Sequence, residues 1–304
     1  MSRRRPRPHE VVAAAYLSVT GLLAAALGDP IGPWVPLLLV HAALVALLLG
    51  GFPRVPEHGA ADVLRDWLPF LALPLAYSEV GRLNALTGGG FHDAAILRLE
   101  AAAFGTQPSL TLREMIPWKP LSEYLHLGYF SYYALGPAYA LPLYLRGRRA
   151  AYRQSLTVLF LVFAVCYLVF VLWPVAGPWY VFRRPDPDAM GWIFPHVEHA
   201  VLDAAASVGA AFPSSHVAAA VAGWLLAFRF DRSVFRVFAF FVPALAVGTV
   251  YGGFHYALDA AAGVAVGAAG YAAGMRLHAA LGGEAEPRPA RTYHVPRAVV
   301  RSGT

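Results

Sequence analysis

The sequence predicts an all-α polytopic membrane protein with about eight transmembrane helices. Three observations support this fold class. Of the 304 residues, 58% are hydrophobic, and the mean hydropathy is +0.52. Charged residues make up only 14% of the chain, whereas soluble domains carry about 25%. Several apolar runs are also long enough to cross a bilayer as helices.

The apolar runs place the predicted spans along the chain. They lie at about 11–28, 32–51, 66–84, 121–145, 153–173, 213–229, 235–253 and 255–276. The first run could instead be a signal peptide, because three alanines at 24–26 provide small residues near its end. We expect a single transmembrane domain over residues 11–281. A disordered basic arm at 1–10 and a disordered polar tail at 282–304 would flank it. The amphipathic stretch 91–100 is typical of a helix lying in the membrane interface.

The basic residues indicate the orientation of the spans. An even number of spans puts both termini on one side, and eighteen of the 24 Lys and Arg residues lie there. That side is therefore predicted to be cytoplasmic. The net charge of +6 is then an orientation signal, and we expect no nucleic-acid partner. The excess of Arg and Ala is typical of a GC-rich genome, so we expect a bacterial inner membrane. The single cysteine, Cys166, excludes a disulfide within the chain.

The tetrapeptide Pro213-Ser214-Ser215-His216 stands at the start of the sixth predicted span. Proline is favoured in the first turn of a helix. There the free N–H groups and the positive end of the helix dipole can bind a phosphate. The hydroxyls of Ser214 and Ser215 would add donors, and His216 would lie one turn inside the helix. A capped helix start with a packed histidine is an equally good interpretation of this motif alone.

A second histidine motif begins the last predicted span. Gly252 and Gly253 permit a sharp entry turn or a close backbone approach. His255 and Asp259 are four residues apart and therefore share one face of a helix. A carboxylate bonded to one imidazole nitrogen fixes the tautomer and leaves the other nitrogen free to attack. A buried pair that only ties helices together is the alternative for this motif taken alone.

The two motifs are more informative together, because both histidines fall at the same predicted, non-cytoplasmic membrane face. Ionisable groups at the ends of apolar helices are costly and usually functional. Two imidazoles can attack a phosphorus centre and protonate its leaving group. Close helix packing would turn His255 and Asp259 into the bundle. The small residues that allow such packing follow roughly the stripe of Asp259 on the last span: Gly263, Gly267, Gly270 and Gly274.

These motifs resemble the type-2 phosphatidic acid phosphatase superfamily, and within it the branch of inositol phosphorylceramide synthases. The second signature of the superfamily is Pro-Ser-Gly-His or a near variant, matched by residues 213–216. Its third signature ends in His-x3-Asp, matched by His255 and Asp259, and the branch typically has His-Tyr, as in His255-Tyr256. Residues 122–137 and 174–178 are also similar to that branch, and the resemblance covers about 90–275.

The resemblance implies a core bundle like that of the type-2 phosphatidic acid phosphatases, with the site at the non-cytoplasmic face. His255 would be the nucleophile and form a phosphohistidine, and Asp259 would orient it. His216 would protonate the departing oxygen and later activate the acceptor. No cofactor and no metal ion are expected for this chemistry.

The first signature of the superfamily, Lys-x6-Arg-Pro, is incomplete in this chain. Arg184 and Pro185 match its end, but Gly177 takes the place of its lysine. Trp179 stands where the synthase branch often has an arginine, and Thr249 stands where the third signature usually has one. A phosphate in transit carries spread negative charge that cationic donors stabilise. Another basic group is therefore needed.

We assign phosphate binding to the arginines nearest in sequence, Arg183 and Arg184, together with Ser214 and Ser215. The more distant candidates for the missing cation are Arg82, Arg98 and Arg113. Weaker candidates for substrate binding are three residues of the regions that resemble the synthase branch: Glu123, His126 and Tyr256.

The leading functional hypothesis is an enzyme of lipid phosphoryl transfer with a membrane phospholipid or lipid phosphate as substrate. With a hydroxyl acceptor it would be a phospholipid head-group phosphotransferase of phosphoinositol type, and the synthase-like details slightly favour this reaction. With water as acceptor it would be a lipid phosphate phosphatase. A metal-dependent hydrolase is a different class, because two histidines and a carboxylate can ligate a metal. A non-enzymatic lipid carrier using the same cavity is a third.

Overall fold

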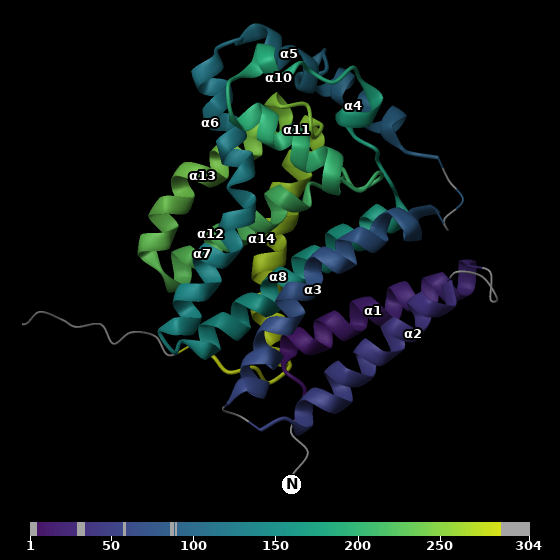
Figure 1. Cartoon of the computed structure of the whole chain (residues 1–304), viewed down its shortest axis with the longest axis vertical. Helices are drawn as coiled ribbons and strands as arrows, with labels where there is room; N and C mark the ends of the chain where they lie inside the picture. The colour runs from purple at the N-terminus through teal and green to yellow at the C-terminus, as the bar shows by residue number, and fades with distance from the viewer. Residues whose placement is uncertain (1–4, 29–33, 57–58, 86–87, 89, 287–304) are drawn as a thin grey trace, which may run out of the picture.

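Helices form almost all of the described chain in the computed structural model, which covers residues 5–28, 34–56, 59–85, 88 and 90–286 (Figure 1). The helices are α1 (Pro8–Leu27), α2 (Trp34–Ala46), α3 (Ala60–Asn84), α4 (Asp93–Phe104), α5 (Pro108–Met115), α6 (Lys119–Phe130), α7 (Tyr132–Leu145), α8 (Arg149–Leu172), α9 (Pro178–Val181), α10 (Pro187–Met190), α11 (Phe194–Ala205), α12 (Ser215–Phe230), α13 (Arg232–Tyr251) and α14 (Ala257–Ala280). A π-helical turn, η1 (Leu47–Gly51), and a 3-10 turn, η2 (Phe52–Arg54), extend α2. The predicted all-α fold is confirmed.

Five helices are long and apolar enough to cross a membrane: α1, α2 with its extension to Arg54, α8, α13 and α14. They coincide with five of the eight predicted spans and support a multi-pass membrane protein. The other three predicted spans are helical but differ from the prediction. Helix α3 carries charged residues in its first two turns. The predicted span 121–145 is divided at Ser131 into α6 and α7, and α12 is an apolar helix of only 16 residues.

The last helix packs through its glycines, as the sequence predicts. A Cβ atom added at Gly263 or Gly267 would lie 2.6 or 2.5 Å from backbone oxygens at the start of α12. A Cβ at Gly270 or Gly274 would lie 2.5 Å from the side chain of Val162 or 2.8 Å from the Cα of Val158, both in α8. Small residues let helix backbones approach this closely. Helix α14 is therefore held directly against the helix that begins with Ser215 and His216.

The structure corrects the prediction of a disordered N-terminal arm over residues 1–10. Its first four residues lie outside the described part of the chain, but Arg7 and Glu10 are buried. Arg7 binds two carboxylates of α3, and Arg65 of α3 donates hydrogen bonds of 2.6 and 2.8 Å to Glu10. Helix α1 therefore starts inside the predicted arm. The cause is ion pairing between helices that are distant in sequence, which hydropathy does not register.

The predicted C-terminal tail, 282–304, lies mostly outside the described residues. Its first five residues are described and follow α14. Within them, Glu286 accepts a hydrogen bond of 2.7 Å from Nε of Arg148 at the start of α8. The folded part of the chain therefore extends a few residues beyond the predicted boundary.

Short helices gather at one end of the molecule, away from α1 and α2. Figure 1 shows α4, α5 and α10 at this end, with α11 beneath them. Helix α4 matches the predicted amphipathic stretch, and its side chains at Asp93, Ile96 and Glu100 are buried. These residues recur every three or four positions, so one face of α4 packs inward. Both histidine motifs lie beneath this group of short helices.

Candidate active site

His216 and His255 meet at the starts of two neighbouring helices. His216 is the second residue of α12, and His255 lies two residues before α14. The centroids of their rings are 5.9 Å apart. Because α12 and α14 pack closely, the two imidazoles are fixed relative to each other by the core of the bundle. The prediction that both histidines lie at one end of the bundle is confirmed by this geometry.

Helix α12 begins two residues later than the Pro-Ser-Ser-His motif suggests. Pro213 precedes the helix, and Ser214 is its N-cap, with the hydroxyl accepting from Val217 N at 3.4 Å. The backbone N–H of Ser214 donates to the carbonyl oxygen of Asp259 at 2.9 Å. The hydroxyl oxygen of Ser214 therefore acts as the N-cap acceptor, whereas Ser215 and His216 line a cavity.

The hydrogen bonds of His255 determine its tautomer. Its Nδ1 lies 3.0 Å from the carbonyl oxygen of Ala211 and 3.4 Å from Oδ2 of Asp259. A carbonyl oxygen can only accept, so Nδ1 carries the proton and donates it. The other ring nitrogen, Nε2, therefore holds a free lone pair. A neutral imidazole in this tautomer is ready to act as a nucleophile through Nε2.

The backbone around Ala211 is positioned by a residue that the sequence did not single out. Asp93 of α4 accepts hydrogen bonds from the backbone N–H groups of Ala176 and Gly177, at 2.9 and 2.8 Å. It also accepts one of 2.9 Å from the hydroxyl of Tyr256. The carbonyl oxygen of Val175, next to this loop, accepts a hydrogen bond of 3.0 Å from the backbone N–H of Ala211. Asp93 thus ties the loop that carries Ala211 to the start of α14.

The loop at Gly177 explains why a lysine is missing from the first signature. Gly177 has a φ of +92°, and a Cβ there would lie 2.9 Å from the Cβ of Ala211. A longer residue would therefore be strained in its backbone and would also displace the segment that orients His255. Any cation for a phosphate must come from another part of the chain.

A cavity of about 730 Å³ extends from His216 into the bundle. Its walls are mainly apolar and aromatic and come from α3, α7, α8, α11, α12 and α13. Residues that line it include Phe70, Tyr132, Phe163, Leu202 and Phe238. This volume is in the range of small-molecule sites. The apolar walls suit a hydrocarbon chain, with the histidine at the polar end.

Aromatic rings surround His216. Its ring centroid is 4.3 Å from that of Tyr132 and 5.2 Å from that of Tyr129. Tyr129 in turn stacks on Phe254 at 4.8 Å. These rings restrict the approach of water to His216 from the side of α6 and α7.

Two predicted substrate-binding residues have other partners. Oxygens of Glu123 accept hydrogen bonds from the backbone N–H groups of Trp192, Ile193 and Phe194, so this side chain caps α11. Tyr256 is fully buried and donates to Asp93. These bonds give both residues positioning roles, and their predicted contacts with substrate stay predictions.

His126 differs from these two residues. Its Nδ1 lies 2.7 Å from the carbonyl oxygen of Ser122, while its Nε2 is buried and has no hydrogen-bond partner among the described residues. Its ring packs against Phe254 at 5.7 Å. Its candidacy for substrate binding stays a prediction.

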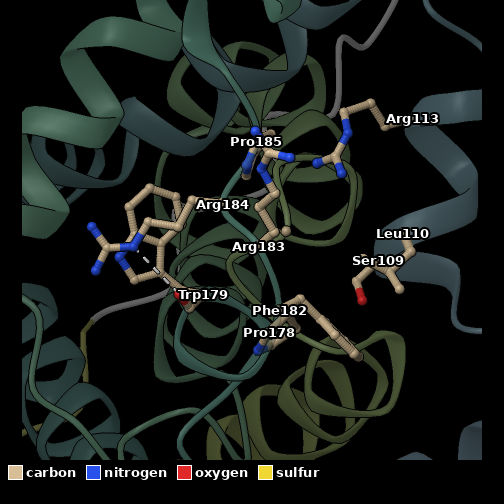
Figure 2. Close-up of a pocket in the computed structure, with 10 residues that line it drawn as sticks. Ser109, Leu110, Arg113, Pro178, Trp179, Phe182, Arg183, Arg184 and Pro185 are labelled. Carbon is tan, nitrogen blue, oxygen red and sulfur yellow. Dashed lines mark hydrogen bonds between the residues drawn. The ribbon is translucent and has the colours of Figure 1, made fainter.

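The two predicted phosphate-binding arginines behave differently. Arg184 forms an ion pair of 2.7 Å with Asp203 and lies over the ring of Trp179 at 4.5 Å. Arg183 lines a small pocket that also includes Arg113 of α5 (Figure 2). The other distant candidates, Arg82 and Arg98, are exposed and line neither this pocket nor the large cavity.

Glu198 of α11 is a polar residue that the sequence analysis missed. It is fully buried, and neither carboxylate oxygen has a hydrogen-bond partner among the described residues. Burial raises the pKa of Glu198 to about 8. One helical turn later, Val201 and Leu202 line the large cavity. The carboxyl group therefore lies on the helix face that is turned towards the cavity.

The fold and the paired histidines define a helical, membrane-embedded protein with a polar site at one end of its bundle. A family model described as the PAP2 superfamily matches residues 94–273, more than half of the chain, and the chain belongs to that superfamily. Both histidine motifs lie within the match. Membership supports an enzyme of the lipid phosphatase or phosphotransferase type. Searches of curated proteins and of solved structures found no significant match.

Proposed function

We propose that this protein is a membrane phosphotransferase that moves a phospholipid head group, of phosphoinositol type, to a hydroxyl acceptor through a phosphohistidine. The observation that carries the proposal is the pair of imidazoles 5.9 Å apart, of which His216 lines a cavity of about 730 Å³. A lipid chain in the cavity would bring its phosphate to His216 and His255. The resemblance of residues 122–137 and 174–178 to the inositol phosphorylceramide synthases supports the choice of head group.

In the first step, the lone pair on Nε2 of His255 attacks the phosphorus, and the bond from phosphorus to the lipid oxygen breaks. His216, in its protonated form, gives its proton to that oxygen, so that a lipid alcohol leaves. In the second step, neutral His216 takes the proton of an acceptor hydroxyl, whose oxygen attacks the phosphohistidine. The bond between phosphorus and nitrogen breaks, and His255 returns to its starting tautomer.

Two features favour a hydroxyl acceptor over water. The rings of Tyr129 and Tyr132 cover His216, which limits hydrolysis of a phosphohistidine. The carboxyl group of Glu198 has no hydrogen-bond partner among the described residues and lies one helical turn from Val201 and Leu202 of the cavity wall. Hydroxyl groups of a polyol or lipid acceptor would satisfy it. Hydrolysis by the same residues, which would make the protein a lipid phosphate phosphatase, is the competing outcome.

The site is proposed to face the periplasm or cell exterior, with both termini in the cytoplasm. The support is the asymmetry of basic residues, eighteen of 24 on the side of the termini. A cysteine introduced near Trp192, which is exposed, should react with an impermeant thiol reagent added to intact cells. If the cysteine reacts only after the membrane is permeabilised, the site faces the cytoplasm and the proposed orientation is wrong.

The reaction is tested on purified protein with a phospholipid labelled at its phosphorus. We expect an acid-labile, alkali-stable phosphoprotein that His255→Ala abolishes and the matched surface variant His196→Ala retains, and a labelled product that contains the added acceptor. Free phosphate or the free phosphorylated head group as the only labelled product would show that water is the acceptor and that the protein is a phosphatase. Lipid transport that persists in His255→Ala without any turnover would point to a carrier. Loss of turnover on chelation would point to a metal-dependent hydrolase.

A further inference from the structure

A second, small pocket lies near the candidate site, with Gly253 in its lining. Ser109 and Arg113 of α5, Trp179 of α9, Arg183 and Gly253 line it, and we call these five residues the donor pocket. In Figure 2, Ser109 and Arg113 come from one side, and Trp179 and Arg183 come from the segment that follows Gly177. Neither His216 nor His255 belongs to its lining.

The donor pocket contains buried hydrogen-bond donors that have no acceptor among the described residues. Oγ of Ser109, Nη1 of Arg113 and Nε1 of Trp179 are all buried, and none has a hydrogen-bond partner among the described residues. Ser109 is 0% exposed and Trp179 is 4% exposed. Leaving a buried donor without an acceptor costs free energy. Three such donors around one pocket indicate an acceptor that enters it.

The charge of the pocket points in the same direction. Within the described residues, Arg113 and Arg183 form no ion pair, whereas Arg184 is neutralised by Asp203. Figure 2 shows the guanidinium ends of Arg113 and Arg183 pointing toward each other, with Arg184 turned away over Trp179. No carboxylate lines the pocket. Burial lowers the pKa of Arg113, but a guanidinium stays charged at neutral pH.

The free donors and the positive charge of the pocket indicate which class of ligand it can bind. A group that accepts several hydrogen bonds and carries negative charge fits the pocket, and a cation or an apolar group does not. The guanidinium fork binds phosphate oxygens particularly well. Gly253 is two residues from His255, and two residues of chain span at most about 7 Å. The pocket therefore adjoins the reacting centre, although the contact between Trp179 and Phe254, at 5.6 Å, stands between it and His216.

We propose that the donor pocket binds a phosphate-type oxyanion in addition to the phosphate that reacts at His255. The anion is a second acidic group on the substrate head group or the inorganic phosphate left by hydrolysis. The assignment rests on the proposed function for its place beside the reacting phosphorus.

Binding of inorganic phosphate tests the pocket directly. It is measured by equilibrium binding of labelled phosphate to purified His255→Ala protein, in which no phosphohistidine can form. We expect binding to persist in that protein and to weaken about 10-fold or more when Arg113→Gln is added. Ser109→Ala removes one donor at little cost in volume and should weaken binding less. Arg98→Gln, which removes an exposed charge outside the pocket, should change nothing.

The source of the anion is tested by turnover. Two lipids with the same chain, one with a single phosphate and one with two adjacent phosphates, are compared in the wild-type enzyme and in Arg113→Gln. If the substrate supplies the anion, the variant loses the preference for the second phosphate. If only free phosphate binds, the variant loses inhibition by phosphate and keeps the ratio between the lipids.

The proposal is overturned if Arg113→Gln binds phosphate as the parent protein does, with thermal unfolding used to confirm that both are folded. A failure of the proposed function has a different signature. The wild-type protein would then form no phosphohistidine, while phosphate binding would still depend on Arg113.

Discussion

Nδ1 of His255 lies 3.0 Å from the carbonyl oxygen of Ala211, closer than the 3.4 Å that separates it from Oδ2 of Asp259. The backbone and the carboxylate therefore share the task of holding the proton on Nδ1. Oδ2 of Asp259 has a further bond, accepting the N–H of Tyr256 at 2.8 Å. The carboxylate thus positions both the ring and the first turn of α14.

This shared arrangement predicts a graded effect for Asp259→Asn. The amide oxygen can still accept the N–H of Tyr256, and Ala211 still fixes the tautomer, so we expect kcat to fall about 10- to 100-fold. His255→Ala should cost orders of magnitude more. The measurement is kcat and phosphohistidine yield for both variants on one labelled lipid. Equal losses in the two variants would show that Ala211 contributes nothing to the orientation of His255.

The proposed roles of the two histidines can be separated by the leaving group. We expect His216→Ala to slow turnover of an alkyl phosphate by about 10²- to 10⁴-fold, because general acid catalysis is lost. A nitrophenyl phosphate leaves without protonation, so the same variant should recover most of its activity on that substrate. His255→Ala should be inactive on both. If activity on the nitrophenyl phosphate is recovered in His255→Ala and not in His216→Ala, then His255 is the general acid and His216 is the nucleophile.

Part of the site follows from the sequence because local patterns encode it. Two histidines at the ends of apolar runs, with Asp259 four residues after one of them, predicted a meeting point that the structure places at a ring distance of 5.9 Å. Short-range spacing and hydropathy were enough for this step. The close packing of the last span could be predicted in the same way, because its glycines recur every three or four residues along one helix face.

The rest of the site depends on pairs that no local pattern reveals. Asp93 bonds to residues 83, 84 and 163 positions away, and Glu123 caps a helix that begins 71 residues later. In the sequence, such a carboxylate cannot be told from a solvated acidic residue, because its partners are distant along the chain. Arg7 was assigned to a disordered arm for the same reason. Long-range ion pairs and caps therefore account for most of the differences from the prediction.

Glu198 should make the stability of the protein depend on pH. Its pKa is about 8 in the folded protein and about 4.3 in an unfolded chain. The folded state thus binds more protons between these values, and stability falls as pH rises through that window, by about 1.4 kcal/mol per unit at most. We expect Tm to drop between pH 5.5 and 8.5, and to drop less in Glu198→Gln. Glu114→Gln, at an exposed carboxylate, is the control, and identical profiles for all three proteins would contradict the prediction.

Gly267→Ala should destabilise the bundle. The added Cβ would lie 2.5 Å from the carbonyl oxygen of Ala218, so α12 and α14 must move apart. Overpacking of this kind costs about 1–3 kcal/mol, and the shift would also disturb His216. Thermal unfolding and turnover should both fall. Gly223→Ala is the matched control for thermal unfolding, because its Cβ would meet Phe238 at an ordinary 3.6 Å, and an equal loss of Tm there would refute the packing argument.

The large cavity should determine which lipid chains the protein accepts. Gly223 lines it opposite Phe238, so Gly223→Leu would fill space that a hydrocarbon chain is expected to occupy. Each methylene that is no longer buried forfeits about 0.8 kcal/mol. We therefore expect kcat/KM to fall about 10-fold or more for a lipid with long chains, while a short-chain analogue that does not reach Gly223 is turned over at the wild-type rate. The assay compares both lipids in parallel in the same detergent. Since the reacting phosphate of the two lipids is identical, an equal fall for both would place the damage at His216 and show that the chain binds elsewhere.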